Sequence, residues 1–329
     1  MLKIAVIGAG RIGHVHARSV AAHPDAELVL ASDPFGDAAE NLAKEYGARF
    51  TKDADEVFAD PDVDAVIIGS PTDLHLGQLI AAAKAGKAVL CEKPIALEVA
   101  KVDQVQAELD KINTPVMFGF NRRFDPSFAA AVDAAKSGKI GTVEQVTIIS
   151  RDPAAPPAQY LTGSGGIFCD MTIHDFDMAR HILGDVVEVS AFGQNFNADI
   201  KAIGDFDAAV IVLRSSTGAI ATITNDRACA PGYDQRLEIH GTSGSVSIDN
   251  VRPTTLRLNN SEVTAAQQPY LDFFLERYAD AYSRELSAFI KAVSTGEKPN
   301  PGIDDAVAAL RLADAATVSA HEGQAVSLV

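Results

Sequence analysis

The chain has 329 residues, of which 47% are hydrophobic, and its 28 basic and 44 acidic residues give a formal net charge of −16. A chain of this length usually forms two domains, because one hydrophobic core rarely serves more than about 250–300 residues. The acidic balance and the lack of any basic run exclude nucleic acid and anionic membrane surfaces as expected partners.

A cytoplasmic location is expected from the start of the chain and from its cysteines. Residues 1–7 enter a strand-like run directly, with no charged and apolar leader, and no apolar run reaches the length of a membrane span. Cys91, Cys169 and Cys229 are widely spaced and odd in number. This pattern favours reduced thiols over disulfide bonds or a zinc site.

The first predicted elements are a strand at 4–7, a glycine-rich turn and a helix that runs to residue 22. The turn, Gly8-Ala9-Gly10-Arg11-Ile12-Gly13, has the Gly-x-Gly-x-x-Gly spacing of dinucleotide-binding domains. Gly8 would allow the tight turn, Gly10 would let a pyrophosphate approach the backbone, and Gly13 would let the helix pack on the strand. The pyrophosphate would bind the free amides at the start of the helix.

Asp33 follows the second predicted strand, at 27–31, and lies 20 residues after Gly13. A carboxylate at this position can accept hydrogen bonds from both ribose hydroxyls of adenosine. It would also repel a 2′-phosphate, and the following Pro34-Phe35-Gly36 includes no cation to receive one. We therefore expect NAD rather than NADP as the cofactor.

Helices and strands alternate from residue 37 to 120, with helices expected at 38–46, 75–85 and 99–109 and strands at 65–69, 88–91 and 116–120. This alternation predicts a doubly wound parallel sheet over residues 1–121. Ligands of such sheets bind beyond the carboxyl ends of the strands. The candidate cofactor-binding residues are therefore Gly8, Ala9, Gly10, Arg11, Ile12, Gly13, Asp33, Pro34, Ser70, Pro71, His75, Glu92 and Lys93.

Lys93 is singled out because it follows the strand at 88–91 and lies between Glu92 and Pro94. At this strand end its ammonium group could donate a hydrogen bond to a substrate hydroxyl beside the nicotinamide. A solvated surface lysine is the alternative interpretation. A cis peptide bond before Pro94 is compatible with the sequence but does not follow from it.

Residues 122–329 change in pattern and are expected to form a second, α+β domain that binds substrate. A helix at 127–137 and two late helices at 271–294 and 303–320 flank strands expected at 143–149, 186–192, 208–213, 219–224, 236–240, 246–248 and 255–258. Strands joined by turns predict a large, mostly antiparallel open sheet. One face of this sheet is not expected to be covered by helices, and such a face commonly packs against another subunit, so we expect a homo-oligomer. The last helices could pack back on the first domain.

One further helix is predicted from Gly163 to Gly184, between glycines that start and stop it. Along it Asp170, His174, Asp177 and His181 recur at spacings of four, three and four, and would share one face. Acid and imidazole groups that line a cavity can transfer protons. The alternatives are an ordinary amphipathic helix and, less favoured because no His-Glu-x-x-His motif or thiol cluster is present, a metal site.

The sequence resembles the glucose–fructose oxidoreductase and inositol dehydrogenase family of NAD(P)-dependent oxidoreductases over its whole length. The resemblance rests on residues 8–13, on Cys91-Glu92-Lys93-Pro94 and on Asp170-x-x-x-His174. Within the family it is strongest to inositol 2-dehydrogenases, through Ser150-Arg151-Asp152-Pro153, residues 165–180 and Gly232-Tyr233-Asp234-Gln235-Arg236.

The resemblance implies a Rossmann domain joined to an α/β domain with an open sheet, usually assembled as a homotetramer through that sheet. It implies catalytic roles for Lys93, Asp170 and His174. No metal is expected, because the sequence lacks a His-Glu-x-x-His motif and clustered thiol ligands. The substrate-binding residues that it implies are Lys93, Asn121, Arg122, Asp152, Asp170, His174 and Tyr233. Among these, Asn121 and Asp152 vary between relatives and could tune which polyol fits.

The activity implied is NAD-dependent oxidation of a ring hydroxyl of a cyclic polyol, foremost myo-inositol to 2-keto-myo-inositol (scyllo-inosose), in polyol catabolism. His174 would take the hydroxyl proton, Asp170 would orient the imidazole, and Lys93 would stabilise the reacting oxygen. With these roles Asp177 and His181 become secondary. The alternatives are another inositol isomer or a pyranose as substrate, an NAD-dependent glycosidase, and a non-catalytic NAD-binding regulator.

Overall fold

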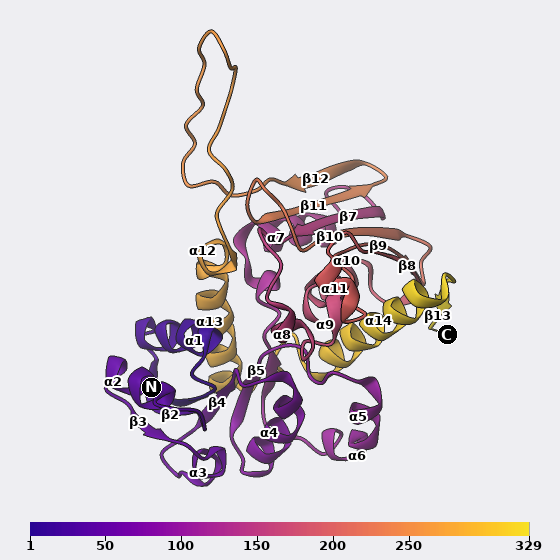
Figure 1. The fold of residues 1–329 in the computed structure, drawn as a ribbon. Helices are drawn as coiled ribbons and strands as arrows, with labels where there is room; N and C mark the ends of the chain where they lie inside the picture. The colour runs from indigo at the N-terminus through magenta and orange to yellow at the C-terminus, as the bar shows by residue number, and fades with distance from the viewer. Residues whose placement is uncertain (329) are drawn as a thin grey trace. The chain divides into compact units, whose positions relative to one another are not determined.

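The computed structural model describes residues 1–328, and the chain divides into two compact units by its internal contacts. Unit 1 comprises Met1–Phe124 and Asp280–Arg311, and unit 2 comprises Asp125–Ala279 and the chain from Leu312 onward. The segment 280–311 thus groups with the N-terminal residues, and the domain boundary between residues 121 and 122 stays a prediction. Figure 1 shows the elements of both units.

Unit 1 is built on a six-stranded sheet in which every strand pair is parallel, in the order β3-β2-β1-β4-β5-β6. The strands are β1 (Leu2–Ile7), β2 (Ala26–Ser32), β3 (Arg49–Thr51), β4 (Ala65–Ile68), β5 (Ala88–Cys91) and β6 (Val116–Phe118). The central strands β4 and β5 are buried along their whole length, as continuous apolar runs in a sheet covered on both faces. The predicted doubly wound sheet is confirmed.

The helices of unit 1 connect these strands and supply the other side of the core. They are α1 (Arg11–Ala22), α2 (Ala38–Tyr46), α3 (Ala54–Ala59), α4 (Thr72–Lys84), α5 (Val99–Gln104), α6 (Gln106–Leu109), the 3-10 helix η1 (Asn121–Phe124) and α13 (Ala279–Thr295). Helix α13 adds Leu286, Phe289 and Ile290 to the same apolar cluster as β1 and α1. Helix α14 (Ile303–Glu322) contributes residues to both units.

Unit 2 contains a seven-stranded sheet in the order β12-β11-β7-β10-β9-β8-β13. The strands are β7 (Val143–Arg151), β8 (Val186–Gln194), β9 (Ala208–Ser215), β10 (Ile220–Asp226), β11 (Asp234–Gly241), β12 (Gly244–Ile248) and β13 (Val326–Ser327). Within the described part of this seven-stranded sheet, β7 and β10 pair in parallel and the other pairs are antiparallel. The predicted mostly antiparallel sheet is confirmed.

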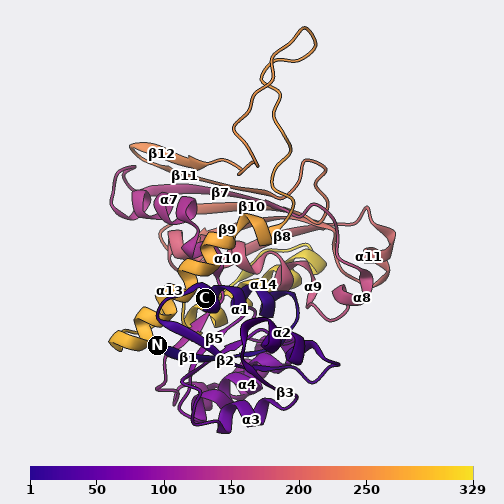
Figure 2. The ribbon, with the colours of Figure 1, turned by 90° about the vertical axis from the view of Figure 1, so that its left-hand side faces the viewer.

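Helices of unit 2 lie on one face of this sheet (Figures 1 and 2). They are α7 (Pro126–Lys136), α8 (Ala158–Leu161), α9 (Gly166–Asp170), α10 (Ile173–Leu183), α11 (Ala198–Ala202) and α12 (Phe274–Arg277). Strand residues alternate accordingly, so that Ile211 and Ile223 are buried while Val210 and Ile220 are exposed. No helix within residues 1–328 is long and apolar enough to cross a membrane.

The single helix predicted from Gly163 to Gly184 is wrong, because the structure divides it into α9 and α10. At the break the Thr172 amide donates to the Ile167 carbonyl, five residues back, which interrupts the α-helical register. The Thr172 hydroxyl also donates to Oδ1 of Asn225 at 2.6 Å. Gly184, with φ of 79°, ends α10 as expected.

Three other predicted elements differ from the structure. The predicted strand at 255–258 lies in a long exposed loop (Figure 1), where its only strand-like pairing is the Leu258–Ala266 bridge. An alternating sequence cannot form a strand without a neighbouring strand. The helix predicted at 271–294 is interrupted at Tyr278, and the one predicted at 99–109 is interrupted at Val105.

Candidate active site

The glycine-rich turn between β1 and α1 has the geometry that a dinucleotide requires. Gly8 has φ of +95°, and a β-carbon there would lie 2.5 Å from the Gly69 carbonyl oxygen. A β-carbon on Gly13 would overlap the Gly8 carbonyl oxygen, whereas one on Gly10 would meet no protein atom within 4 Å. Gly8 and Gly13 therefore serve close backbone packing, and Gly10 leaves open space before the start of α1. The residues present thus fit a bound pyrophosphate.

Asp33 follows β2 and is tied to the same turn. Its Oδ2 accepts a hydrogen bond from the Ala9 amide at 2.8 Å, and its Oδ1 accepts one from the Phe35 amide at 2.9 Å. These bonds fix the carboxylate at the end of the strand beside the glycine turn. Pro34 and Phe35 are exposed, so the side chains that follow Asp33 offer an apolar surface and no cation.

Ser70, Pro71 and His75 follow β4, and His75 connects the end of this strand to the end of β5. Ser70 donates its hydroxyl to Gln78 at 2.6 Å, and Pro71 precedes the first turn of α4. His75, which is buried, has its two ring nitrogens 2.8 Å from the carbonyl oxygens of Pro94 and Ser70. Burial lowers the pKa of His75, and the two carbonyl oxygens oppose that effect. His75 links the ends of β4 and β5, and a direct contact with the cofactor stays a prediction.

The Glu92-Lys93-Pro94 segment follows β5, and its Lys93–Pro94 peptide bond is cis. Glu92 is buried, and its Oε1 lies 2.8 Å from Nε2 of His16 on α1. Lys93 is half-buried. The partner His16 was not among the predicted site residues, although its position three residues after Gly13 on the helix gave a signal for it.

Asn121 and Arg122 lie in η1, which follows β6, and both side chains are buried. The next residue, Arg123, donates to Asp305 at 2.9 Å and to Asn300 at 2.6 Å. The 3-10 turn is therefore anchored within unit 1 by an ion pair to α14. Substrate contacts by Asn121 and Arg122 stay predictions.

Asp170, the last residue of α9, belongs to a network of charged and polar groups in unit 2. Its Oδ1 accepts the Tyr160 hydroxyl at 3.0 Å, and its Oδ2 accepts from Arg227 at 3.1 Å. Arg227 is 1% exposed and also donates to Asp205 at 3.2 Å. Asp205 in turn accepts the Ile167 amide at 2.9 Å, near the start of α9. Arg227 was missed in the sequence because the pairing joins segments far apart in the chain.

His174 lies in the first turn of α10 and is half-buried. The next residue, Asp175, is buried and accepts a hydrogen bond from Asn225 at 2.8 Å. Asp177 is also buried, and His181 lies 3.2 Å from Nζ of Lys136. Because the helix breaks before Ile173, the predicted four-residue stripe on one continuous helix is wrong, although Asp170 and His174 lie on consecutive helices.

Asp152 and Tyr233 lie at the ends of neighbouring strands of the unit 2 sheet. The Asp152 amide donates to the Asp226 carbonyl at 2.9 Å, directly after β7. Tyr233 precedes β11, is buried, and packs edge-on against Phe273 and Tyr278 at centroid distances of 5.8 and 5.9 Å. The two predicted substrate contacts therefore come from the same end of the paired strands β7 and β11.

These features together define a class of protein. A parallel sheet with the dinucleotide turn and an acidic residue after its second strand binds a nicotinamide dinucleotide. A second unit that carries a carboxylate and an imidazole on consecutive helices can supply the proton transfer of an alcohol oxidation. The class is a two-unit, nicotinamide-dependent oxidoreductase.

Comparisons with known proteins identify the family. Residues 2–120 match the oxidoreductase family described as having an NAD-binding Rossmann fold, and residues 128–247 match the GFO/IDH/MocA C-terminal domain. The chain is 44% identical to an inositol 2-dehydrogenase of Rhizobium meliloti (strain 1021), over 99% of both chains. It is 36% identical to a scyllo-inositol 2-dehydrogenase (NAD(+)) of Bacillus subtilis (strain 168), over 99% of this chain and 96% of the relative.

Among solved structures, a myo-inositol dehydrogenase from Corynebacterium glutamicum ATCC 13032 superposes with a TM-score of 0.98 at 48% identity, over 100% of this chain and 99% of the other. The chain belongs to the GFO/IDH/MocA family of oxidoreductases, and residues 2–120 are its NAD-binding Rossmann domain. The predicted family, fold class, enzyme class and cofactor are confirmed.

Proposed function

We propose that the protein is an NAD-dependent inositol 2-dehydrogenase, which oxidises myo-inositol to 2-keto-myo-inositol with formation of NADH. The observation that carries the proposal is the similarity of both units, over nearly the whole chain, to proteins named inositol or myo-inositol dehydrogenase. The geometry supports it, because the open space at Gly10 and the anchored Asp33 suit NAD. Asp170 ends α9, and His174 lies in the first turn of the next helix, α10.

In the proposed mechanism NAD, when bound, supplies the acceptor for the hydride that leaves the hydroxyl-bearing carbon. His174 takes the hydroxyl proton as general base. Asp170 favours the imidazolium that results, and Arg227 in turn holds the Asp170 carboxylate in place. Lys93 donates a hydrogen bond to the reacting oxygen and stabilises its alkoxide character.

The remaining hydroxyls of the substrate are assigned to Asn121, Arg122, Asp152 and Tyr233. Recognition of one polyol isomer depends on polar groups that would be left unsatisfied by the wrong isomer. Arg122 and Tyr233 are buried, and Tyr233 packs against Phe273 and Tyr278, which suits a site that must distinguish isomers. Asp152 is half-buried after β7 and offers a carboxylate acceptor.

The test is an NADH absorbance assay with myo-inositol, scyllo-inositol, chiro-inositol and glucose as substrates. We expect the highest kcat/KM with myo-inositol, followed by identification of the inosose product by mass spectrometry and NMR. A higher value with scyllo-inositol would favour the second candidate, which the similarity to the Bacillus subtilis enzyme supports. Release of free sugar without net NADH would instead indicate a glycosidase, and NAD binding without turnover a regulator.

We also propose an oligomeric state and a cellular location for the protein. We infer a homotetramer formed through the bare face of the seven-stranded sheet, because Phe192, Val210 and Ile220 are exposed there. Light scattering after size exclusion measures the mass directly, and a monomer would refute the assembly. A cytoplasmic location agrees with three buried cysteines that are not joined in disulfides, and a role in polyol catabolism agrees with the proposed substrate.

A further inference from the structure

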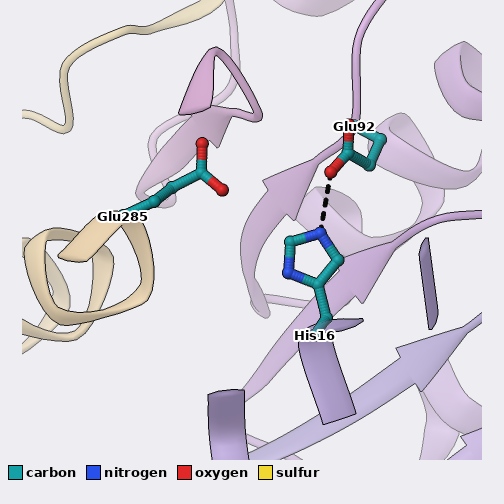
Figure 3. Close-up of side chains that lie close together, drawn as sticks. All are labelled: His16, Glu92 and Glu285. Carbon is teal, nitrogen blue, oxygen red and sulfur yellow. Dashed lines mark hydrogen bonds and ion pairs between the residues drawn. The ribbon is translucent and has the colours of Figure 1, made fainter. Parts of the chain in front are cut away.

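Unit 1 contains a buried group of three ionisable side chains that the mechanism above does not use. His16 from α1, Glu92 after β5 and Glu285 from α13 converge on one point, as Figure 3 shows. One nitrogen or oxygen atom from each lies within 4.8 Å of the others. His16 and Glu285 are 0% exposed and Glu92 is 7% exposed. Side chains of this kind are almost never buried unless their charge is compensated.

Two members of the group form a hydrogen-bonded pair, and the third faces them. His16 Nε2 lies 2.8 Å from Glu92 Oε1. Neither carboxyl oxygen of Glu285 makes a hydrogen bond within the described chain, although Figure 3 shows the group directed at the pair. Tyr282, one turn earlier on α13, packs edge-on against the His16 ring at 5.7 Å. Glu285 thus lies with His16 and Glu92 in one cluster, and the Tyr282 ring packs against His16.

The position of Glu92 is also restricted from the side of the sheet. A β-carbon on Gly119 would lie 2.9 Å from the Glu92 carboxyl carbon, so the carboxylate lies directly on the backbone after β6. The Glu92 amide donates to the Ile68 carbonyl at 2.9 Å. Lys93 is the next residue, so any force that holds the Glu92 side chain also holds the turn that carries Lys93.

Two ways exist to make this group electrically neutral. With both carboxyls ionised and the imidazole neutral its charge is −2, which either two protons or one divalent cation would cancel. The direct 2.8 Å bond between His16 and Glu92 favours protons. If these two atoms bound one metal ion with bond lengths near 2.1 Å and tetrahedral angles, they would lie about 3.4 Å apart, which is farther than the observed 2.8 Å. Burial and the nearby Glu92 charge raise the pKa of Glu285 well above the usual range of a glutamate, which also favours a protonated carboxyl group.

We propose that Glu285 is a positioning residue for Lys93: it is a neutral carboxylic acid that hydrogen-bonds through one water molecule to the His16–Glu92 pair and so fixes the Glu92-Lys93-Pro94 turn. An ionised Glu285 would repel the Glu92 carboxylate in a site with little water. An apolar residue would leave the pair without its third polar neighbour. The part of the proposal that concerns catalysis rests on the proposed function of Lys93.

The first arm of the test compares thermal unfolding of the wild type and Glu285→Gln from pH 5 to pH 8. An acid whose pKa is raised in the folded state ionises first in the unfolded chain, so wild-type stability falls as pH rises above about 4.3, its unfolded value. Glutamine cannot ionise. We expect the Tm of Glu285→Gln minus that of the wild type to increase steadily with pH, and a difference that does not increase would overturn the proposal.

The second arm measures kcat and the KM for NAD in Glu285→Gln and Glu285→Leu, with Glu297→Gln and Glu297→Leu as matched controls at an exposed position just after α13. We expect Glu285→Gln to keep kcat within threefold, because its amide replaces the neutral acid. Glu285→Leu should lose at least tenfold in kcat with little change in KM. Full activity of Glu285→Leu would show that Glu285 only fills space, and an equal loss in both variants would show that its negative charge is required.

Two measurements keep the test independent of turnover. The rate at which Lys93 reacts with an amine-specific reagent, followed by peptide mass spectrometry, should change in Glu285→Leu and not in Glu285→Gln. Metal analysis of the purified wild type should show less than 0.1 equivalent of any divalent cation. One equivalent that is lost in Glu285→Gln would replace the proton model with a metal site. If the wild type lacked dehydrogenase activity, the Tm difference and the Lys93 labelling would still decide the role of Glu285.

Discussion

Gly13 lies so close to Gly8 that a β-carbon on Gly13 would overlap the Gly8 carbonyl oxygen. The obstructing atom belongs to the backbone of the turn itself and cannot rotate away. We expect Gly13→Ala to lower the free energy of unfolding by about 1–3 kcal/mol, the usual cost of overpacking. Chemical denaturation measures this value. Wild-type stability of Gly13→Ala would contradict the observed packing of α1 on the turn.

Gly10→Ala is the contrasting change, because its added methyl group meets no protein atom within 4 Å. The variant should unfold at the wild-type temperature, yet the methyl group would enter the space assigned to the pyrophosphate. We expect the Kd for NAD to rise at least about tenfold, equivalent to about 1.4 kcal/mol. A fluorescence titration with NADH gives the affinity, and unchanged binding would show that the pyrophosphate does not approach Gly10.

Asp33→Ser combined with Pro34→Arg should shift preference from NAD toward NADP. The double change removes the carboxylate that would repel a 2′-phosphate and adds a cation to bind it. Steady-state kcat/KM values with both cofactors measure the shift. Asp37→Ser is a suitable control, because it removes the same charge from an exposed position four residues away. Selectivity that stays as in the wild type would refute the role given to Asp33.

His174→Ala should lower kcat by about 10²- to 10⁴-fold, because it removes the proposed general base. NAD binding should be unchanged, because the pyrophosphate and ribose contacts are assigned to the glycine turn and to Asp33, which the substitution leaves intact. His181→Ala is the matched control on the same helix, and near-wild-type kcat is expected for it. Rapid turnover by His174→Ala would assign the base to another residue.

Arg227→Met should destabilise the protein by about 3–5 kcal/mol, because it leaves Asp170 and Asp205 without the cation that they share. Arg214→Met provides the comparison: Arg214 pairs with Glu188 on the surface, where such a pair contributes about 0–1 kcal/mol. Urea denaturation of both variants gives the difference. Equal stabilities would show that the Arg227 network does not hold the segment around Asp170.

Local patterns were sufficient to predict the parallel sheet and the cofactor turn. The apolar runs of β1, β4 and β5 and the interleaved helices are short-range features, and so is the spacing of Gly8, Gly10 and Gly13. Gly8 and Gly13 have roles determined by backbone atoms a few residues away or at the end of the adjacent strand. The sequence also indicated Lys93 and His174 through their motifs, but it could not assign their neighbours.

Tertiary structure decided which side chains meet. The helix predicted through Asp170 and His174 divides because Thr172 bonds to Asn225, a residue 53 positions later on β10. Arg227 reaches Asp170, and Glu285 reaches His16 and Glu92, only because separate segments pack together. Periodicity and spacing describe interactions within one helix or turn. They carry no information on contacts between segments, which depend on how the sheets and helices bury their apolar faces.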